Sequence, residues 1–298
     1  MALEEIELVN IKMINLKDGI KIQQENNFNS YSSLFIVDNK VIKIYTDRYD
    51  KVKFNIITLK SLFKKEKYLR KIKELVLPNK LIKHKNNIVG FSMPYIKGLT
   101  LEEIINNNSY SEKEIEEIFI KILNVIIELS KLPFDFCLAD LHEKNVIVDS
   151  NKNIHLIDCD GFVIDDNQMV IDGSILMGKY LEQKNKDEDL NGVNVSGDYF
   201  CLLCMVINYI FKNKIHTIDD LKDFSEYLDD KYLNKIITRA SDIKNFKLTQ
   251  SDIEMLFSQI NYYNEKYETY QNDIEKLLEV ELIRIRKKNN SLSNFIVK

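Results

Sequence analysis

The sequence predicts an α+β protein made of a small β-rich N-terminal lobe with one main helix and a larger, mostly helical C-terminal lobe. Residues 1–47 show the apolar alternation that is typical of strands, whereas nearly every segment beyond Asp198 shows helical periodicity. The change of character falls near residues 94–98. We therefore assign 1–94 to the N-terminal lobe and 95–298 to the C-terminal lobe, and the 298 residues suffice for both cores.

The N-terminal lobe is predicted from one hairpin and one helix. In "LFIVDNKVIKIYT" two apolar runs flank Asp38-Asn39-Lys40, a turn-forming cluster that predicts a β-hairpin. A helical period follows over about 52–75. Its apolar stripe is formed by Leu59, Leu62, Phe63, Leu69 and Ile72.

The C-terminal lobe is predicted from helix starts and one apolar run. Capping boxes open helices at Thr100, at Ser111 and at Ser251, each with Glu three residues later. The run "YFCLLCMVINYIF" is apolar on every side, which predicts a buried helix and assigns its C-x-x-C to the core rather than to zinc. Residues 259–290 predict a helix-rich tail, either a last lobe helix or a partner-binding extension.

Composition narrows the function classes. The formal net charge is −4, and nucleic-acid-binding proteins are usually basic, so we expect no nucleic-acid partner. No apolar run reaches the roughly 18 residues of a membrane span, and the acidic start "MALEEIELVN" is unlike a secretory signal. The scattered cysteines fit a reducing compartment. We expect a cytoplasmic protein, and delivery into another cell stays open.

The stretch "LADLHEKNVIVDSNKNIHLIDCDGF" concentrates polar residues around a second predicted hairpin. Asn145 precedes its first strand and Asp158 ends its second strand, so an antiparallel pair places the two side by side. Amide and carboxylate oxygens suit magnesium, and Asp140 on the preceding loop could accept a proton from a hydroxyl. The alternative is that all three residues cap turns or end a strand.

This stretch resembles the catalytic loop and metal-binding segment of the protein kinase superfamily, H-R-D-x-x-x-x-N followed by D-F-G, here "LADLHEKN" and "DCD". The resemblance implies a bilobal kinase-like fold that uses ATP and Mg²⁺, with Mn²⁺ as an alternative ion. It implies that Asp140 is the catalytic base and that Asn145 and Asp158 hold the metal. Asp160 would bind a second metal ion or cap the turn at Gly161.

Lys43 in "VIKIY" resembles the lysine that contacts the α- and β-phosphates in this superfamily and pairs with a helix glutamate. A lysine inside an apolar strand needs a partner if its amine points inward. Glu66 shares the apolar stripe of the predicted helix, so we expect it to pair with Lys43. The alternative for Glu66 is an exposed pair with Arg70.

The segment "GFSMPYIKGLTLEEI" resembles the connection between kinase lobes, where backbone groups hold adenine. The resemblance places Met93 beside the base and makes Tyr95 and Ile96 the backbone contacts, since Pro94 has no N–H. "SGDYFCLLCMVINYIF" resembles the central helix of the C-terminal lobe. Asp198 would then accept backbone donors of the catalytic loop, or else act as an ordinary acid near a helix N-terminus.

The glycine-rich loop of the superfamily is absent. Its place is taken by "QQENNFNSYSSLFIV", in which Asn29, Ser30 and Ser32 are the candidates to contact phosphate. Asn tolerates left-handed conformations and serine hydroxyls can donate to phosphate. The segment therefore either still covers the nucleotide, through side chains as well as backbone, or has lost this role.

The catalytic loop also departs from the usual pattern. Leu138 and Ala139 replace His-Arg, so activity is not expected to depend on a phosphorylated activation loop. His142 makes the loop similar to aminoglycoside and choline kinases and some atypical bacterial kinases, and it would contact the γ-phosphate or shape the acceptor site. Cys159 stands where the D-F-G phenylalanine would be, which puts that regulatory switch in doubt.

The resemblance as a whole implies an ATP-dependent protein serine/threonine kinase, because an activation-like segment at 158–182 and the central helix are present. The alternatives are a small-molecule kinase, a pseudokinase that acts as a nucleotide-binding scaffold, and a nucleotidyl transferase. The partner is accordingly a protein substrate or a small-molecule acceptor. The sequence assigns no oligomeric state.

Overall fold

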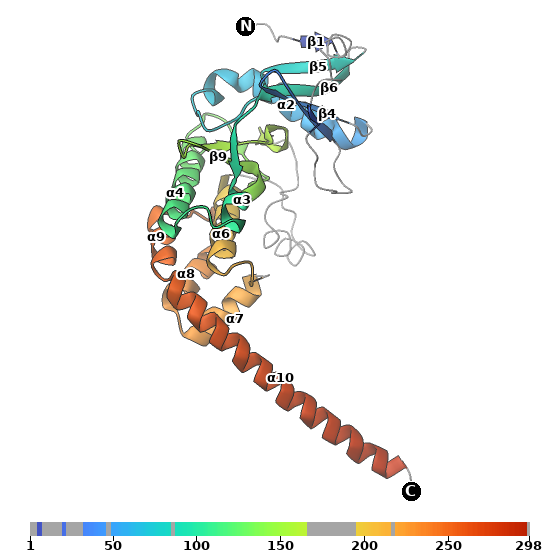
Figure 1. Ribbon diagram of the computed structural model, residues 1–298, viewed down its shortest axis with the longest axis vertical. Helices are drawn as coiled ribbons and strands as arrows, with labels where there is room; N and C mark the ends of the chain where they lie inside the picture. The colour runs from blue at the N-terminus through green and yellow to red at the C-terminus, as the bar shows by residue number, and fades with distance from the viewer. Residues whose placement is uncertain are drawn as a thin grey trace.

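The computed structural model describes residues 5–7, 20–21, 32–45, 49–84, 87–165, 195–215 and 218–296. Within these ranges the chain is mixed α/β, with a small sheet region at the N-terminal side and a helical region at the C-terminal side (Figure 1). This agrees with the predicted α+β class and with the predicted order of a β-rich part before a helical part. In the described part of the chain, no helix is both long and apolar enough to cross a membrane.

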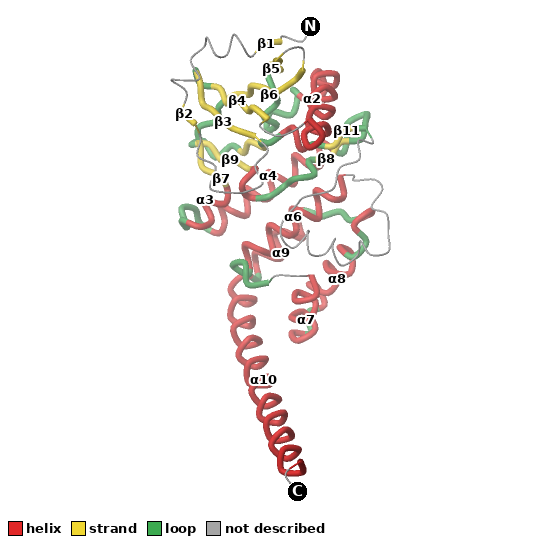
Figure 2. Tube along the Cα trace, turned by 90° about the vertical axis from the view of Figure 1, so that its right-hand side faces the viewer, coloured by secondary structure: helices red, strands yellow, loops and turns green. Residues whose placement is uncertain are grey.

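The N-terminal region is built around one six-stranded sheet and one helix, α2 (Tyr49–Leu69). The strand order is β1-β5-β6-β4-β3-β2; all neighbours are antiparallel except β1 and β5, which are parallel (Figure 2). The strands are β1 (Glu5–Glu7), β2 (Ile20–Lys21), β3 (Ser32–Val37), β4 (Lys40–Tyr45), β5 (Lys80–His84) and β6 (Asn87–Pro94).

The predicted hairpin is confirmed as β3 and β4, which pair from Ser32↔Tyr45 to Val37↔Lys40. Asp38 and Asn39 form the turn with φ of 48° and 61°. Two consecutive left-handed residues match the right-handed twist of the strands that they join, and Asn and Asp tolerate this conformation best among non-glycine residues.

Helix α2 begins earlier and ends earlier than the predicted 52–75. Leu59, Leu62 and Leu69 are buried as expected, with exposed fractions of 2% or less. After Leu69 the backbone leaves the helix, because Leu75 forms a parallel bridge with Leu156. Val76 N–H donates to Leu156 O at 2.9 Å, and Leu156 N–H donates to Glu74 O at 2.7 Å.

Short strands connect the two regions. A three-stranded sheet in the order β10-β9-β7 contains β7 (Gly98–Thr100), β9 (Val146–Asp149) and β10 (Ile154–Leu156). A separate antiparallel pair joins β8 (Phe136–Cys137) to β11 (Val163–Ile164). Two 3₁₀ turns, η1 (Glu143–Asn145) and η2 (Cys159–Gly161), lie next to these strands.

The C-terminal region is helical. It contains α3 (Leu101–Asn106), α4 (Glu112–Leu129), α6 (Val195–Ile210), α7 (Ile218–Leu228), α8 (Lys231–Ala240), η3 (Ile243–Asn245), α9 (Gln250–Ser258) and α10 (Ile260–Ile296). Helix α6 is the predicted apolar run, and nearly all of its side chains are buried, including Cys201 and Cys204. One continuous hydrophobic core includes Phe91 and Leu59 together with Phe119 and Phe200, so the two regions are packed on one another.

The predicted capping boxes at Thr100 and Ser111 are confirmed: each hydroxyl accepts the N–H of the glutamate three residues later, and that glutamate accepts the cap N–H. The start predicted at Ser251 is wrong. Helix α9 is capped two residues earlier by Thr249, whose box partner is Asp252. Because Thr249 is the N-cap, Asp252 is the N3 residue that completes the box, whereas Glu254 lies two residues further into the helix; Asp252 also binds Arg239 at 3.0 Å.

Gly90 generates a stability prediction. It lies in β6, and a Cβ at this position would stand 2.1 Å from the backbone oxygen of Lys43 in β4. We expect Gly90→Ala to lower the free energy of unfolding by about 1–3 kcal/mol or more, since two paired backbones must separate. Urea denaturation measures this change.

Gly161→Ala is the matched control, because its Cβ would meet its nearest neighbour, Asp140 Cβ, at 3.7 Å, an ordinary contact. We expect this variant to change the free energy of unfolding by less than about 0.5–1 kcal/mol. Equal stability of the two variants would contradict the assigned approach of β4 and β6.

Candidate functional site

The β9–β10 hairpin places Asn145 next to the end of the second strand. Val146 pairs with Leu156, and Ile157 N–H donates to Asn145 O at 3.0 Å. Asn145 and Asp158, which flank the hairpin, are therefore side by side, as the sequence predicted. Lys152 occupies the left-handed region in the turn, and Asp149 accepts the N–H groups of Asn151 and Asn153.

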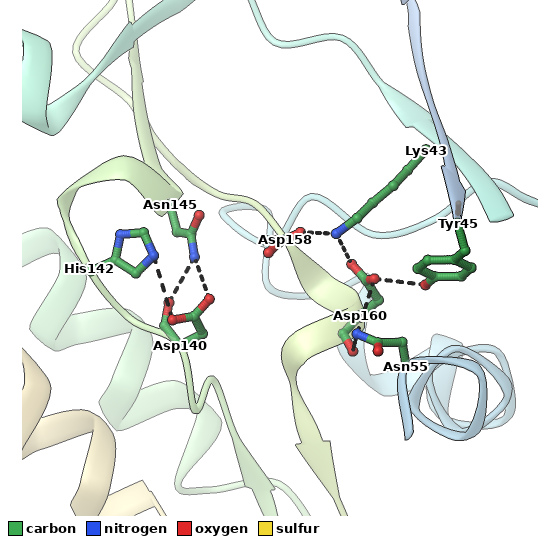
Figure 3. Close-up of polar contacts among 8 residues, drawn as sticks. All are labelled: Lys43, Tyr45, Asn55, Asp140, His142, Asn145, Asp158 and Asp160. Atoms are coloured by element: carbon green, nitrogen blue, oxygen red, sulfur yellow. Dashed lines mark hydrogen bonds and ion pairs between the residues drawn. The ribbon is translucent and has the colours of Figure 1, made fainter. Parts of the chain in front are cut away.

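The β8–β11 pair brings Asp140 to the same place. Cys137 pairs with Val163, so the loop that leaves β8 and the turn that enters β11 lie against each other. As a result Gly161 lies close to Asp140: a Cβ placed on this glycine would be 3.7 Å from the Cβ of Asp140. Two independent strand pairs thus collect polar groups from three chain segments in one region (Figure 3).

Asp140, His142 and Asn145 form the first polar group. Asn145 Nδ2 donates to Asp140 O at 2.9 Å and to Asp140 Oδ2 at 3.2 Å, which leaves the amide oxygen turned away from Asp140 (Figure 3). His142 Nε2 lies 3.5 Å from Asp140 Oδ1, and His142 Nδ1 accepts the N–H of Lys144. Burial lowers the pKa of His142, but the hydrogen bond and charge of Asp140 raise it more, so the net direction is upward.

Lys43 and two carboxylates form the second polar group. Lys43 Nζ lies 2.5 Å from Asp158 Oδ1 and 2.8 Å from Asp160 Oδ1, and only 11% of the lysine side chain is exposed. Burial by itself lowers the pKa of Lys43, but the two carboxylates outweigh it and raise the pKa, so the amine stays charged. Burial raises the pKa of Asp158, and the charge of Lys43 reverses this and holds it below its usual range.

Asp160 belongs to a buried network that the sequence did not predict. Its side chain is 1% exposed; Oδ1 accepts from Lys43, while Oδ2 accepts from Tyr45 Oη at 2.7 Å and Asn55 Nδ2 at 3.3 Å. Burial raises the pKa of Asp160 and of Tyr45, so the hydroxyl remains a donor. The role of Asp160 as a metal ligand stays a prediction; in this structure its two oxygens accept from Lys43, Tyr45 and Asn55.

The expected Lys43–Glu66 pair is replaced. Glu66 forms an i,i+4 pair with Arg70 at the surface, whereas Asn55 and Thr58 are the α2 side chains that reach the site region. Asn55 Nδ2 also donates to Asp160 O at 3.1 Å, and Thr58 Oγ1 donates to Phe162 O at 2.9 Å. Asn55 lies four residues before Leu59, on the same apolar stripe of the helix. A polar residue in this stripe was the sequence signal that could have identified Asn55 as the residue of α2 that contacts Asp160.

The residues expected at the adenine contact are placed as follows. Met93 is buried in β6, and Ile96 is half-buried against the core. Tyr95 N–H donates to Asn39 O at 3.1 Å, so this donor is used within the protein and is not available to a base. Of the loop candidates, Ser32 is half-buried in β3 opposite Tyr45. Asn29 and Ser30 lie outside the described residues.

Asp198 holds the loop before Asp140. This fully buried carboxylate at the start of α6 accepts the N–H of Leu138 at 2.9 Å, the N–H of Ala139 at 3.1 Å and the Cys137 thiol at 3.1 Å. Ala139 has φ of 60°, an unusual conformation for alanine that the two N–H bonds stabilise. The predicted contact of Asp198 with loop donors is therefore present in the structure.

The donors that fit a divalent ion are the Asn145 amide oxygen and Asp158, whose side chain is 37% exposed. Both are hard oxygen donors of the kind that Mg²⁺ and Mn²⁺ take. Among the described residues there is no group of three or more His, Cys, Asp or Glu side chains that could hold a metal ion by itself. Compared with known proteins, the sequence matches no protein-family model and no curated protein.

Asp198 predicts a pH dependence of stability. Burial raises its pKa to about 6, because the loop hydrogen bonds offset only part of the cost of a buried charge. The folded state thus binds the proton more tightly than the unfolded chain. The free energy of unfolding should fall by about 3 kcal/mol as pH rises from about 4 to about 6, and the loss is complete above that.

The measurement is urea denaturation across this pH range for the wild type and for Asp198→Asn, which does not titrate. The difference in unfolding free energy, wild type minus variant, should decline with rising pH. A difference that is flat or rises would contradict the assignment of a buried, proton-binding Asp198.

Asn55 and Glu66 give a matched comparison on α2. Asn55→Ala removes the hydrogen bonds to Asp160 and should lower the free energy of unfolding by about 1–3 kcal/mol, because buried acceptors lose their donor. Glu66→Ala removes only a surface pair and should cost about 0.5 kcal/mol or less. Chemical denaturation of both variants tests this order. A larger loss of unfolding free energy for Glu66→Ala would contradict it and would indicate that Glu66, rather than Asn55, connects α2 to the site around Lys43.

Proposed function

We propose that this protein is an ATP- and magnesium-dependent phosphotransferase with a kinase-like bilobal fold, and that its acceptor is the hydroxyl of a protein serine or threonine. The observation that carries the proposal is the convergence of Lys43, Asp140, Asn145 and Asp158, which come from β4, two loops and the end of a hairpin. The kinase-like order of these residues along the chain supports the same reading.

The roles follow from chemistry and placement. Asp140 is part-exposed and can orient an acceptor hydroxyl and take its proton. The Asn145 oxygen and Asp158 would hold Mg²⁺, which, when bound, neutralises charge on the phosphate oxygens. Lys43 remains charged and can bind phosphate oxygens once its bond to Asp158 is shared with the metal and nucleotide. The proposed place of this reaction is the cytoplasm.

A small-molecule acceptor is the second candidate, and His142 favours it. The imidazole lies 3.5 Å from Asp140 Oδ1 and is one-quarter exposed, so it would touch whatever acceptor stands before the base. The loop around His142 also resembles that of aminoglycoside and choline kinases, which supports an acceptor of the same class. The two acceptors call for the same base, metal ligands and lysine, so the product decides between them.

The test is incubation with γ-labelled ATP and Mg²⁺, alone and with cell lysate, for the wild type, Asp140→Asn and Asp158→Ala. We expect labelled protein, reduced by about 10²–10⁴-fold in the variants, since a proton acceptor or a metal ligand is lost. Glu128→Gln, which alters an exposed surface carboxylate, is the control and should keep full activity.

Other outcomes separate the alternatives. Label confined to small molecules identifies a small-molecule kinase, and transfer from α-labelled but not γ-labelled ATP identifies a nucleotidyl transferase. An ATP-dependent thermal shift without turnover identifies a nucleotide-binding scaffold. The absence of any ATP-dependent thermal shift would contradict the proposal.

A further inference from the structure

The two carboxylate partners of Lys43 differ in how far each is exposed to solvent. The Asp158 side chain is 37% exposed, whereas the Asp160 side chain is 1% exposed. Asp158 follows the hairpin and lies beside Asn145, while Asp160 is enclosed by side chains of β4 and α2 (Figure 3). Of the two carboxylates, Asp158 is therefore the one that a ligand from solution can reach.

Two side chains of β4 hold the Asp160 carboxylate. Residues two apart in a strand point to the same face of the sheet, so Lys43 and Tyr45 both face the turn that contains Asp160. Lys43 Nζ donates to Asp160 Oδ1 at 2.8 Å, and Tyr45 Oη donates to Asp160 Oδ2 at 2.7 Å. Each carboxylate oxygen is thus bonded to a different side chain, and the carboxylate cannot rotate without breaking one of these bonds.

Helix α2 holds the same residue through Asn55. The amide nitrogen Nδ2 of Asn55 donates to Asp160 O at 3.1 Å and to Asp160 Oδ2 at 3.3 Å. One side chain of the helix therefore restrains both the backbone and the carboxylate of Asp160. Contacts within the protein alone set the position of this carboxylate, whether or not a ligand is bound.

The proposed function gives Asp158 two roles that compete. Asp158 pairs with Lys43 at 2.5 Å, and it would also hold Mg²⁺. The Lys43 side chain is 11% exposed, and a buried ammonium group without a carboxylate partner is strongly unfavourable. Asp160 can supply that partner while Asp158 contacts the metal, because its bond to Lys43 does not involve Asp158.

We infer that Asp160 is a positioning residue, which keeps the Lys43 amine directed at the phosphate oxygens of the nucleotide when Asp158 contacts the metal. Tyr45 and Asn55 fix Asp160 in the orientation that this requires. The inference rests on the proposed function, because it assigns a role within the same site. It differs from the predicted role of Asp160 as a ligand of a second metal ion, since a metal ligand would act independently of Lys43.

The test is a double-mutant cycle of Asp160→Asn and Lys43→Met. It is measured as kcat/KM for transfer from ATP and, separately, as the Kd of Mg·ATP by calorimetry. Asp160→Asn removes the charge with little change in volume, and we expect kcat/KM to fall by about 10- to 100-fold, because Lys43 loses its fixed partner. If Asp160 acts through Lys43, the double variant is no worse than Lys43→Met alone in either measurement.

An effect of Asp160→Asn that persists in the Lys43→Met background would overturn the inference. If the same background also requires a higher Mg²⁺ concentration for half-maximal activity, Asp160 is a metal ligand instead.

Tyr45→Phe tests the same role without changing a charge, in case Asp160→Asn does not fold. It removes only the hydroxyl that donates to Asp160, so we expect kcat/KM to fall by about 2- to 10-fold, the equivalent of one hydrogen bond. The fall should disappear in the Lys43→Met background, which a general loss of stability would not explain. Urea denaturation shows that each variant is folded under the conditions of the assay.

Glu66→Gln is the matched control, because it also replaces a carboxylate by an amide. Glu66 pairs with Arg70 at the surface, so this variant should keep the activity of the wild type. A loss equal to that of Asp160→Asn would make Glu66 the partner of Lys43 during the reaction and would overturn the inference.

Failure of the inference and failure of the proposed function give different results. A wild type that neither binds Mg·ATP nor transfers phosphate contradicts the proposed function, and the inference falls with it. An active wild type in which Asp160→Asn and Tyr45→Phe leave both kcat/KM and the Kd of Mg·ATP unchanged overturns the inference alone.

Discussion

The site depends on one buried cation. Lys43 stands in an apolar strand, and an ammonium group out of water is tolerated only when carboxylates surround it. Asp158 and Asp160 meet this requirement, and both lie more than 100 residues away in sequence. The ion pairs therefore connect the sheet to the turn before β11. Tyr45 and Asn55 donate the remaining hydrogen bonds to Asp160. This single carboxylate therefore links β4, α2 and the turn before β11.

A second buried carboxylate fixes the other half of the site. Asp198 uses its charge to hold the backbone of 138–139, including a left-handed alanine, and the loop then presents Asp140 and His142 together. The two halves differ in design. Around Lys43 the restraint acts between side chains, whereas around Asp198 a side chain restrains a backbone. Between them lies the β9–β10 hairpin, which sets Asn145 beside the end of the second strand.

The sequence predicted what local patterns determine. The β3–β4 hairpin, the boxes at Thr100 and Ser111 and the proximity of Asn145 to Asp158 all follow from turn chemistry and strand pairing, and the structure contains them. The partner of Lys43 was not predictable in this way. Asn55 and Glu66 share one stripe of α2, and only the packing of the helix on the turn before β11 decides which one faces inward.

The parallel bridge between Leu75 and Leu156 has a consequence for motion. Together with the bonds from Asn55 and Thr58, it fastens α2 and the segment just after this helix to β10 and to the turn that follows β10, at Asp160 and Phe162. The helix is thus carried by the C-terminal region, although the sheet flanks it in the sequence. If the two regions rotate against each other, α2 moves with the C-terminal region and the sheet changes its position relative to both. Lys43, which lies in the sheet, would then change its distance from Asp158 with this rotation.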